Sequence, residues 1–453
     1  MSIDISNINY PVKDHLKTKI VIQDNHFLIK LAESIPWESF AELAINDLYN
    51  DRKKSGKKLN IRLHLGACIL QSLFNWTDRE LEENLNYYAP AKVFCGITDR
   101  AYTHSAYVKF RNRLNEDTIK RFNVNLLKVA SRKGFTGSEF MDFDSTVQEA
   151  NIEYPTDIRM MQSLLRKANK TICYLVEKGS RKAKKIKESY NLDRTFKDIK
   201  TYFFAKKCKK GFELKKKIFK SVERKTNKMV KEIQGLSKVI QGYKLKWNIK
   251  KDVEQITTIG PKLLKQIRYF IKHQKVADNK ILSLHAKEVK CIVKGKIGKP
   301  CEFGRKYFIG RLPGNYSFVF TDKNIGLEDS VSLECGINEF KEIFDVAPSS
   351  ITGDQGFWSR PNLKSCHNHN IKEIGITPRG YKNWKVPTAK IDEMKKRRSK
   401  VEPIIGHLKR RGMGRSKMKS DEMTKLAGQR SSFSLNMVRL IKDLQNEELK
   451  STG

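Results

Sequence analysis

The sequence predicts a protein of mixed α and β structure in which a helical block interrupts the part that contains the strands. Three observations support this fold class. Apolar residues recur at helical spacing up to about residue 134, short strand-like segments follow Gly134 and residue 281, and the stretch between them is helical and basic. At 453 residues the chain is long enough for two or three domains.

Residues 1–134 are predicted to form a helical N-terminal domain that binds DNA, mediates dimerisation, or does both. Thr77–Glu80 has the sequence of a capping box, in which a threonine and a glutamate satisfy the first backbone N–H groups of a helix. Asn115 is a second candidate cap, and Gly134 stops the helix that begins there.

After Gly134, residues 139–146 are short, apolar and strand-like, and a basic helical insertion is predicted over about 158–280. Residues 151–250 contain 29 Lys/Arg and 9 Asp/Glu, which gives a charge of +20. A heptad-like apolar seam runs through Leu214, Ile218, Val222, Met229, Ile233, Leu236 and Ile240. We expect a helical hairpin whose basic face contacts phosphates; the alternative is a solvated basic helix.

The rest of the chain predicts further strands and then two helices. Strand-like segments are 291–293, 303–309, 316–321, 350–353 and 371–376, with a turn at Pro313–Asn315. The first final helix surrounds Glu402. The second presents an apolar face formed by Phe433, Met437, Leu440, Ile441 and Leu444.

The charge of the chain indicates its partner. With 90 basic and 50 acidic residues it has a net charge of +40 and a pI near 9.8, so a nucleic acid is expected before an anionic membrane. No apolar run approaches the roughly 20 residues that cross a bilayer, and the N-terminus lacks the pattern of a signal peptide. We therefore expect a cytoplasmic protein without a membrane partner.

Three carboxylates have contexts that suggest chemistry. Glu402 is the only acid between Lys395 and Lys419, a run that contains eleven Lys/Arg residues. Asp144 is expected at the end of a strand, and Asp354 follows another strand between two glycines. Two strand-end carboxylates and one from a helix could hold a pair of divalent ions about 3.5–4 Å apart, which supports in-line attack on a phosphate.

The residues around these carboxylates resemble the motifs of bacterial insertion-sequence transposases of the DDE type. Asp144-Ser145-Thr146 and the residues up to Asp157 look like the first-aspartate motif, and Gly353–Ser359 is similar to the second. Arg398, Glu402 and Lys409 match the Arg–Glu–Lys part of the signature around the glutamate. Ile61–Ile97 resembles the helical domain that precedes the catalytic domain in this group.

The resemblance implies an RNase H-like catalytic domain over residues 135–453, interrupted by the basic insertion. It also implies that Asp144, Asp354 and Glu402 are both catalytic residues and ligands of Mg²⁺ or Mn²⁺, with two ions bound. The partner would be double-stranded DNA at the inverted repeats of the element and at the target. A homodimer or larger assembly on DNA, close to the bacterial nucleoid, is expected.

The sequence departs from the family pattern at two places and leaves one choice open. Position 395 is Lys where the signature has Tyr. Pro403 is unfavourable inside a helix, so either a new helix starts there with Glu402 at its cap or the helix kinks. Asp142 lies two residues before Asp144 and shares its strand face, which makes it an alternative first ligand.

The predicted DNA contacts are Arg398, Lys400, Lys409, Arg410 and Trp358. Arg398 and Lys409 could instead pair with Glu402 at helical spacing, and Trp358 could be a core residue rather than one that stacks on a base. The function expected from these features is metal-dependent cleavage at element ends and transfer of the 3′-OH into target DNA. The alternatives are an RNase H-like nuclease without strand transfer and a catalytically silent DNA-binding protein.

Overall fold

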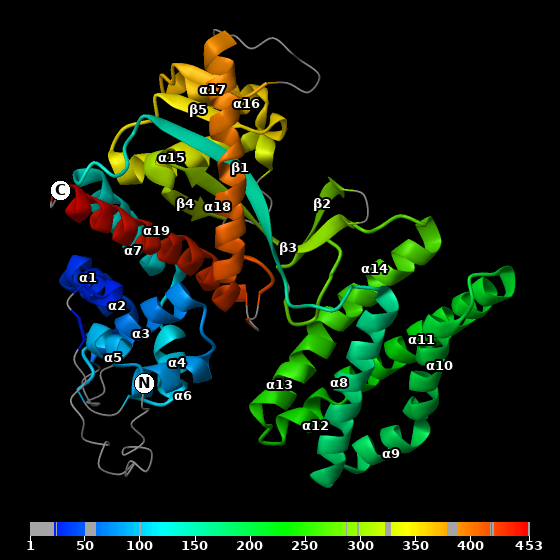
Figure 1. Cartoon of the computed structure of the whole chain (residues 1–453). Coiled ribbons are helices and arrows are strands. Elements are labelled where there is room, and N and C mark those ends of the chain that lie inside the picture. The colour runs from blue at the N-terminus through cyan, green and yellow to red at the C-terminus, as the bar shows by residue number, and fades with distance from the viewer. Residues whose placement is uncertain are drawn as a thin grey trace, which may run out of the picture. The chain divides into compact units, whose positions relative to one another are not determined.

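The computed structural model describes residues 22–23, 25–49, 60–98, 101–286, 288–296, 299–321, 328–377, 388–416, 418 and 421–451. The chain divides into two compact units (Figure 1). The first consists of Met1–Glu149 and Arg305–Gly453, and the second is Ala150–Gly304. The fold is mixed α/β and mostly helical, as the sequence predicted at this level.

The N-terminal part of the first unit is helical, which confirms the prediction for this segment. Its helices are α1 (Phe27–Ser34), α2 (Trp37–Tyr49), α3 (Ile61–Phe74), α4 (Asp78–Tyr87), α5 (Ala89–Cys95), α6 (His104–Arg111) and α7 (Glu116–Arg132). The capping box at Thr77 and Glu80 is present, and the Asn115 side chain accepts from the N–H of Thr118. Residues 1–21 and 50–59 of the predicted domain lie outside the described residues.

A mixed sheet follows these helices, and its strand order is β2-β3-β1-β5-β6, with β4 also paired to β3. The strands are β1 (Phe140–Glu149), β2 (Lys290–Lys296), β3 (Lys299–Arg311), β4 (Ser317–Phe320), β5 (Ser350–Gly353) and β6 (Glu373–Gly375). Strand β5 runs parallel to β1 and to β6, whereas β3 is antiparallel to β2 and β4. All the predicted strand segments are present, with shifted ends.

Successive side chains of β1 face opposite sides of the sheet, because side chains alternate along a strand. Phe143 packs against α15 (Leu333–Phe344), where a Cβ on Gly336 would lie 2.7 Å from the ring. Asp142 points to the other side and contacts Arg397 of α17 (Thr388–Ser399). Helix α17 packs on β1 and β5, and α18 (Val401–Leu408) packs on β1. The remaining helix of this region is α16 (Arg360–Asn368).

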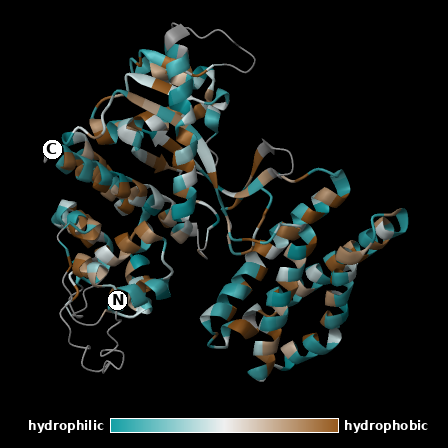
Figure 2. Cartoon of the chain, viewed as in Figure 1, coloured by the Kyte–Doolittle hydropathy of each residue, from teal (hydrophilic) through white to brown (hydrophobic). Residues whose placement is uncertain are grey.

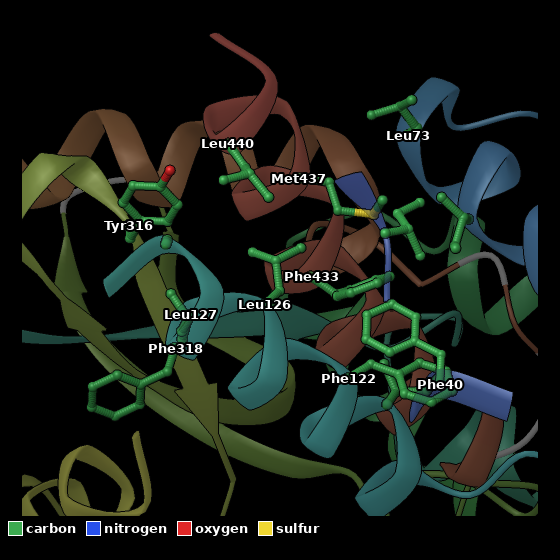
Figure 3. Close-up of a cluster of buried hydrophobic side chains, with 14 of the residues drawn as sticks. Phe40, Leu73, Phe122, Leu126, Leu127, Tyr316, Phe318, Phe433, Met437 and Leu440 are labelled. Atoms are coloured by element: carbon green, nitrogen blue, oxygen red, sulfur yellow. The ribbon is translucent and has the colours of Figure 1, made fainter. Parts of the chain in front are cut away.

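The last helix, α19 (Asp421–Ser451), joins the N-terminal helices and the sheet into one hydrophobic core. Figure 3 shows Phe433, Met437 and Leu440 of α19 together with Phe40 and Phe122 of α2 and α7. The predicted apolar face of α19 is therefore confirmed. Polar residues outside this face are also buried, since Ser431, Ser432, Ser434 and Asn436 are fully inaccessible. The apolar face alone did not indicate this.

The second unit has its own hydrophobic core. The sequence predicted a two-helix hairpin, but more than two helices contribute to this core. They are α8 (Asp157–Glu177), α9 (Arg181–Ser189), α10 (Leu192–Phe204), α11 (Lys209–Gly235), α12 (Ser237–Gln241), α13 (Trp247–Glu254) and α14 (Gly260–His273), with a π-helix at Gln255–Ile259. The predicted seam is buried from Ile218 to Ile240, but Leu214 is 40% exposed, so its assignment to the seam was wrong. Figure 2 shows hydrophilic and hydrophobic residues on these same helices.

Candidate active site

Asp144 and Asp354 are neighbours because two parallel strands place them at matching positions. In the register of β1 and β5, Phe143 lies opposite Gly353, and each aspartate is the next residue. Strand β5 ends at Gly353, whereas β1 continues to Glu149. The prediction that Asp144 ends its strand was therefore wrong. It lies in the middle of β1, beside the point where the adjacent strand stops.

Local backbone N–H groups orient both carboxylates. The N–H of Ser145 donates to Oδ1 of Asp144 at 2.6 Å. The N–H of Gln355 donates to Oδ1 of Asp354 at 2.7 Å, at the start of a 3₁₀ turn. Such bonds use one lone pair of each carboxylate and leave the second oxygen able to bind another group.

The two carboxylates repel one another. Burial raises the pKa of the Asp144 carboxyl above its ordinary value, and the charges of Asp354 and Asp329 raise it further. The Ser145 N–H and the Arg398 guanidinium act in the opposite direction but do not offset the increase. A raised pKa means that the ionised form is unfavourable, so a bound cation would stabilise this site.

Asp142, the alternative first ligand, is occupied by structural contacts. It is completely buried and forms an ion pair with Arg311. Nε of Arg397 lies 2.8 Å from its Oδ1, and the Thr352 hydroxyl donates to the same oxygen at 2.7 Å. Because both oxygens are bonded to buried groups of the protein, Asp142 is unsuited to bind an ion, and Asp144 is the better candidate.

The adjacent arginines Arg397 and Arg398 have different roles. Arg397 is buried, pairs with Asp142, and donates from Nη2 to the Ser350 hydroxyl at 2.9 Å. The Arg398 side chain is 47% exposed and its Nη2 lies 3.6 Å from Oδ1 of Asp354. The carboxylate nearest to Arg398 is thus Asp354 rather than Glu402, the partner considered from the sequence. An exposed guanidinium beside the aspartates can also reach a phosphate.

The sequence did not identify Asp329 and Lys306 as parts of this region. Asp329 begins a 3₁₀ turn at Asp329–Val331, and its charge acts on Asp144. Nζ of Lys306, on β3, lies 2.7 Å from Oδ2 of Asp329. Glu328 and Asp329 are adjacent in the sequence but stand in no pattern that indicates a site, so only the folded chain could place Asp329 here.

Glu402 lies in the first turn of α18 and is exposed. Helix α17 ends at Ser399 and α18 begins at Val401, so the single helix predicted around Glu402 is two helices. Pro403 therefore falls in the first turn of α18, where a missing N–H costs no hydrogen bond. This resolves the geometry that the sequence left open, with Glu402 inside the new helix rather than at its cap.

The structure brings together two of the three predicted ligands. Among the residues that it describes, no three His, Cys, Asp or Glu side chains lie near enough to hold a metal ion. Asp144 and Asp354 offer the oxygen donors that Mg²⁺ prefers, and their mutual repulsion suits a divalent cation. Glu402 is on the helix that packs on β1, and its place in the triad stays a prediction.

The predicted DNA contacts are accessible. Arg398, Lys400, Lys409, Arg410 and Trp358 are all exposed. Trp358 is 40% exposed, so it is not a core residue. Lys409 and Arg410 belong to a π-helix, Lys409–Met413, which continues α18. Each of these side chains can reach a ligand without a rearrangement of the core.

Comparison with known proteins relates the N-terminal helices to transposases. Residues 17–113 match the family described as Transposase domain (DUF772), a segment that contains α1 to α6. The match supports a transposase function in general, with DNA as the partner. Searches of curated proteins and of solved structures gave no match. Among the helices that the structure describes, none has the length and apolar character needed for a membrane crossing.

Proposed function

We propose that the protein is a DNA transposase of the DDE type, with Asp144, Asp354 and Glu402 as its catalytic carboxylates. The observation that carries this proposal is the parallel register of β1 and β5. It sets Asp144 beside Asp354 on the sheet face that α17 covers, next to the helix that bears Glu402. The motifs around the three residues and the DUF772 match support the same function.

The fold supports an RNase H-like assignment for residues 135–453. A mixed sheet in which β5 is parallel to β1, flanked by helices on both faces, fits the fold that the resemblance implies. The basic helical unit Ala150–Gly304 then corresponds to the insertion. Its exposed lysines are suited to hold the DNA backbone, because each phosphate contact releases counterions.

The chemistry proposed for this site has two steps. A water oxygen attacks the phosphorus at the element end, the bond to the 3′ oxygen breaks, and the departing strand end takes up a proton as a 3′-OH. That hydroxyl then attacks a phosphorus of target DNA and gives up its proton to solvent, the bond to the leaving 3′ oxygen breaks, and that oxygen takes up a proton as the 3′-OH of the target strand. Mg²⁺ or Mn²⁺ ions, when bound by Asp144, Asp354 and Glu402, would activate the attacking oxygen and stabilise the leaving one.

The protein side chains supply position and charge. Arg398, which lies at 3.6 Å from Asp354, would hold the phosphate next to the reacting bond. Lys400, Lys409, Arg410 and Trp358 would hold the flanking strand. Because two element ends must react together, we expect a homodimer or larger assembly on DNA, in the bacterial cytoplasm near the nucleoid.

The test uses the full chain, Mg²⁺ and a labelled duplex that carries the DNA ends flanking the coding sequence. Wild type should release a 3′-OH at the element end and give strand-transfer products with a target plasmid. Glu402→Gln should abolish both products and keep DNA binding. Glu393→Gln is the matched control, since Glu393 is exposed on the adjacent helix α17 and should not affect either step.

The outcomes separate the candidate functions. Nicking without a strand-transfer product would favour an RNase H-like nuclease. DNA binding without cleavage, unchanged in Glu402→Gln, would overturn the enzymatic proposal in favour of a silent DNA-binding protein.

A further inference from the structure

A basic pocket of about 280 Å³ lies in the first unit. Neither Asp144 nor Asp354 is among the residues that line it. Its walls come from the turn between α3 and α4 and from the π-helix Lys409–Met413 with the residues that follow it. The lining contains five Lys/Arg side chains and a single carboxylate, that of Asp78. An excess of positive charge in a concave site favours an anionic ligand.

The carboxylate in this pocket is already neutralised. Asp78 forms an ion pair with the buried Arg111, and Nε2 of Gln71 donates to its Oδ1 at 2.7 Å. These contacts hold the pKa of the Asp78 carboxyl below its ordinary value, although burial acts against them. The lowered pKa keeps Asp78 ionised, and because Arg111 pairs with it, its charge offsets little of the charge on the other arginines of the pocket.

The arginines lack such partners. In the described part of the chain, no carboxylate forms an ion pair with Arg410, Arg411 or Arg415. The Nε atom of Arg411 is buried without a hydrogen-bond partner. Burial and the neighbouring Arg410 lower the pKa of the Arg411 guanidinium, as expected for two adjacent cations without an anion.

A buried arginine adds charge beneath the pocket. Arg430 of α19 is 7% exposed and donates to the Ser72 hydroxyl at 2.7 Å, to the carbonyl of Cys68 at 3.0 Å and to Oε1 of Gln71 at 3.1 Å. These acceptors are all neutral. They fix the guanidinium in place without an ion pair. The Asp78 carboxylate acts on Arg430 only through a longer-range charge interaction, so Arg430 still adds positive charge to the pocket.

The pocket also has an aromatic wall. Trp76 lines it and stacks on Phe74, with the ring centroids 4.6 Å apart and the planes at 22°. A rigid aromatic surface beside several guanidinium groups suits a phosphate together with the sugar attached to it. An isolated inorganic anion would use only the cationic side.

Strand β1 fixes the distance between this pocket and the aspartates. The N–H of Glu149 donates to the carbonyl of Gly414 at 3.1 Å, and the N–H of Ser416 donates to the carbonyl of Glu149 at 2.7 Å. Asp144 lies five residues earlier on β1, which corresponds to about 16 Å at roughly 3.3 Å per residue. Duplex DNA rises about 3.4 Å and turns about 34° per nucleotide, so two phosphates of one strand that lie about 16 Å apart in a straight line are separated by about three nucleotides.

We propose that the pocket formed by Trp76, Arg411 and Arg415 binds a backbone phosphate of the DNA strand, about three nucleotides from the phosphate held at Asp144. The inference rests on the proposed function for the identity of the second phosphate. It makes the turn between α3 and α4, in the transposase-like helices, a part of the DNA site. Two contacts on one strand would set the register of the DNA relative to the aspartates.

The first test needs no variant. Element-end duplexes, each with one phosphate replaced by an uncharged methylphosphonate, are titrated with the full chain without Mg²⁺, and binding is followed by fluorescence anisotropy. Binding should weaken at the element-end phosphate, which Arg398 would hold, and again about three nucleotides from it, on one strand. A profile that is flat at the second position would overturn the pocket proposal.

The second test removes the cations. Arg411→Ala/Arg415→Ala should reduce the slope of log Kobs against log salt by about 1, because the pocket holds one phosphate and each phosphate contact contributes about 0.9. It should also abolish the second methylphosphonate effect. The control is Arg121→Ala/Lys133→Ala, which removes the same charge from cations already paired with Asp117 and Glu447. An equal change of slope in the control would assign the effect to net charge and overturn the proposal.

Binding and cleavage outcomes can be distinguished. Two interference positions without cleavage in Mg²⁺ would contradict the proposed function and leave the pocket assignment intact. Cleavage with no effect at the second position would contradict the pocket assignment alone. The melting temperature of each variant is measured, and Arg410→Gln, at an exposed lining residue, provides a milder substitution in the same pocket.

Discussion

Two carboxylates of strand β1 differ in how their charge is compensated. Asp142 is buried and paired with Arg311 and Arg397. Asp144, two residues later, lies beside Asp354, and the ion pair of Arg398 is with Asp354. Both carboxylates point to the same sheet face, because side chains alternate along a strand. The comparison indicates that Asp142 stabilises the fold, whereas Asp144 retains negative charge that a cation can bind.

The largest expected effect is on catalysis. Asp144→Asn should reduce cleavage about 10³-fold or more, because it removes a ligand that the chemistry requires. Its free energy of unfolding in urea should stay close to that of wild type or increase, since an amide relieves the repulsion with Asp354. Unchanged cleavage in this variant would contradict a catalytic role for Asp144 and so remove its contrast with Asp142.

Asp142→Asn should act on stability instead. It leaves Arg311 and Arg397 buried without a full counter-charge, and we expect the free energy of unfolding to fall by about 3–5 kcal/mol. Urea denaturation measures this loss. Thr352→Val is the milder control, expected to lose about 1 kcal/mol with the hydroxyl that donates to Asp142. A stable Asp142→Asn protein that cannot cleave DNA would instead make Asp142 a member of the site.

Arg397 and Arg398 differ in the same way as Asp142 and Asp144. Arg397→Ala should lower the free energy of unfolding by about 3 kcal/mol, because it removes one partner of a buried ion pair. Arg398→Ala should lower it by less than about 1 kcal/mol, since its pair with Asp354 is exposed. DNA binding should weaken in Arg398→Ala only. Equal losses of stability in the two variants would show that Arg397 and Arg398 contribute equally to folding.

The smallest effect is a dependence of stability on pH. Because the pKa of Asp144 is raised in the folded protein, its contribution is fully present below the unfolded pKa. That contribution is lost as the pH rises through the folded pKa. The free energy of unfolding of wild type, relative to Asp144→Asn, should therefore decrease from about pH 3 upwards. Mg²⁺ should oppose this decrease, and a difference that increases with pH would contradict the assignment.

Much of the fold was predictable because its signals are local. The capping box at Thr77 and the cap at Asn115 depend on residues three positions away, so a short stretch of sequence contains the whole interaction. The strand that contains Asp144 and the strand that ends just before Asp354 were found for the same reason. The bundle of the second unit was not, because its core combines helices far apart in the chain.

The site was predicted in part for a comparable reason. The motifs identified Asp144 and Asp354, and the structure places them side by side. Asp329 and Lys306 were missed, since nothing near them in the sequence marks a role. The basic run around Glu402 gave no sign that Arg397 turns inward while Arg398 turns outward.

By itself, the sequence determined the helical and strand segments, the excess of positive charge and the carboxylates with unusual surroundings. Only the tertiary structure decided which charges remain available. Asp142 and Arg397 are 255 residues apart in the chain, and neither has a local partner that would explain its burial. An ion pair of that kind forms when packing removes both groups from water together, so it cannot be read from neighbouring residues. The position of Glu402, the only acid between Lys395 and Lys419, was likewise decided by the tertiary structure. The chain breaks between α17 and α18, both of which pack on β1, and Glu402 falls in the first turn of α18.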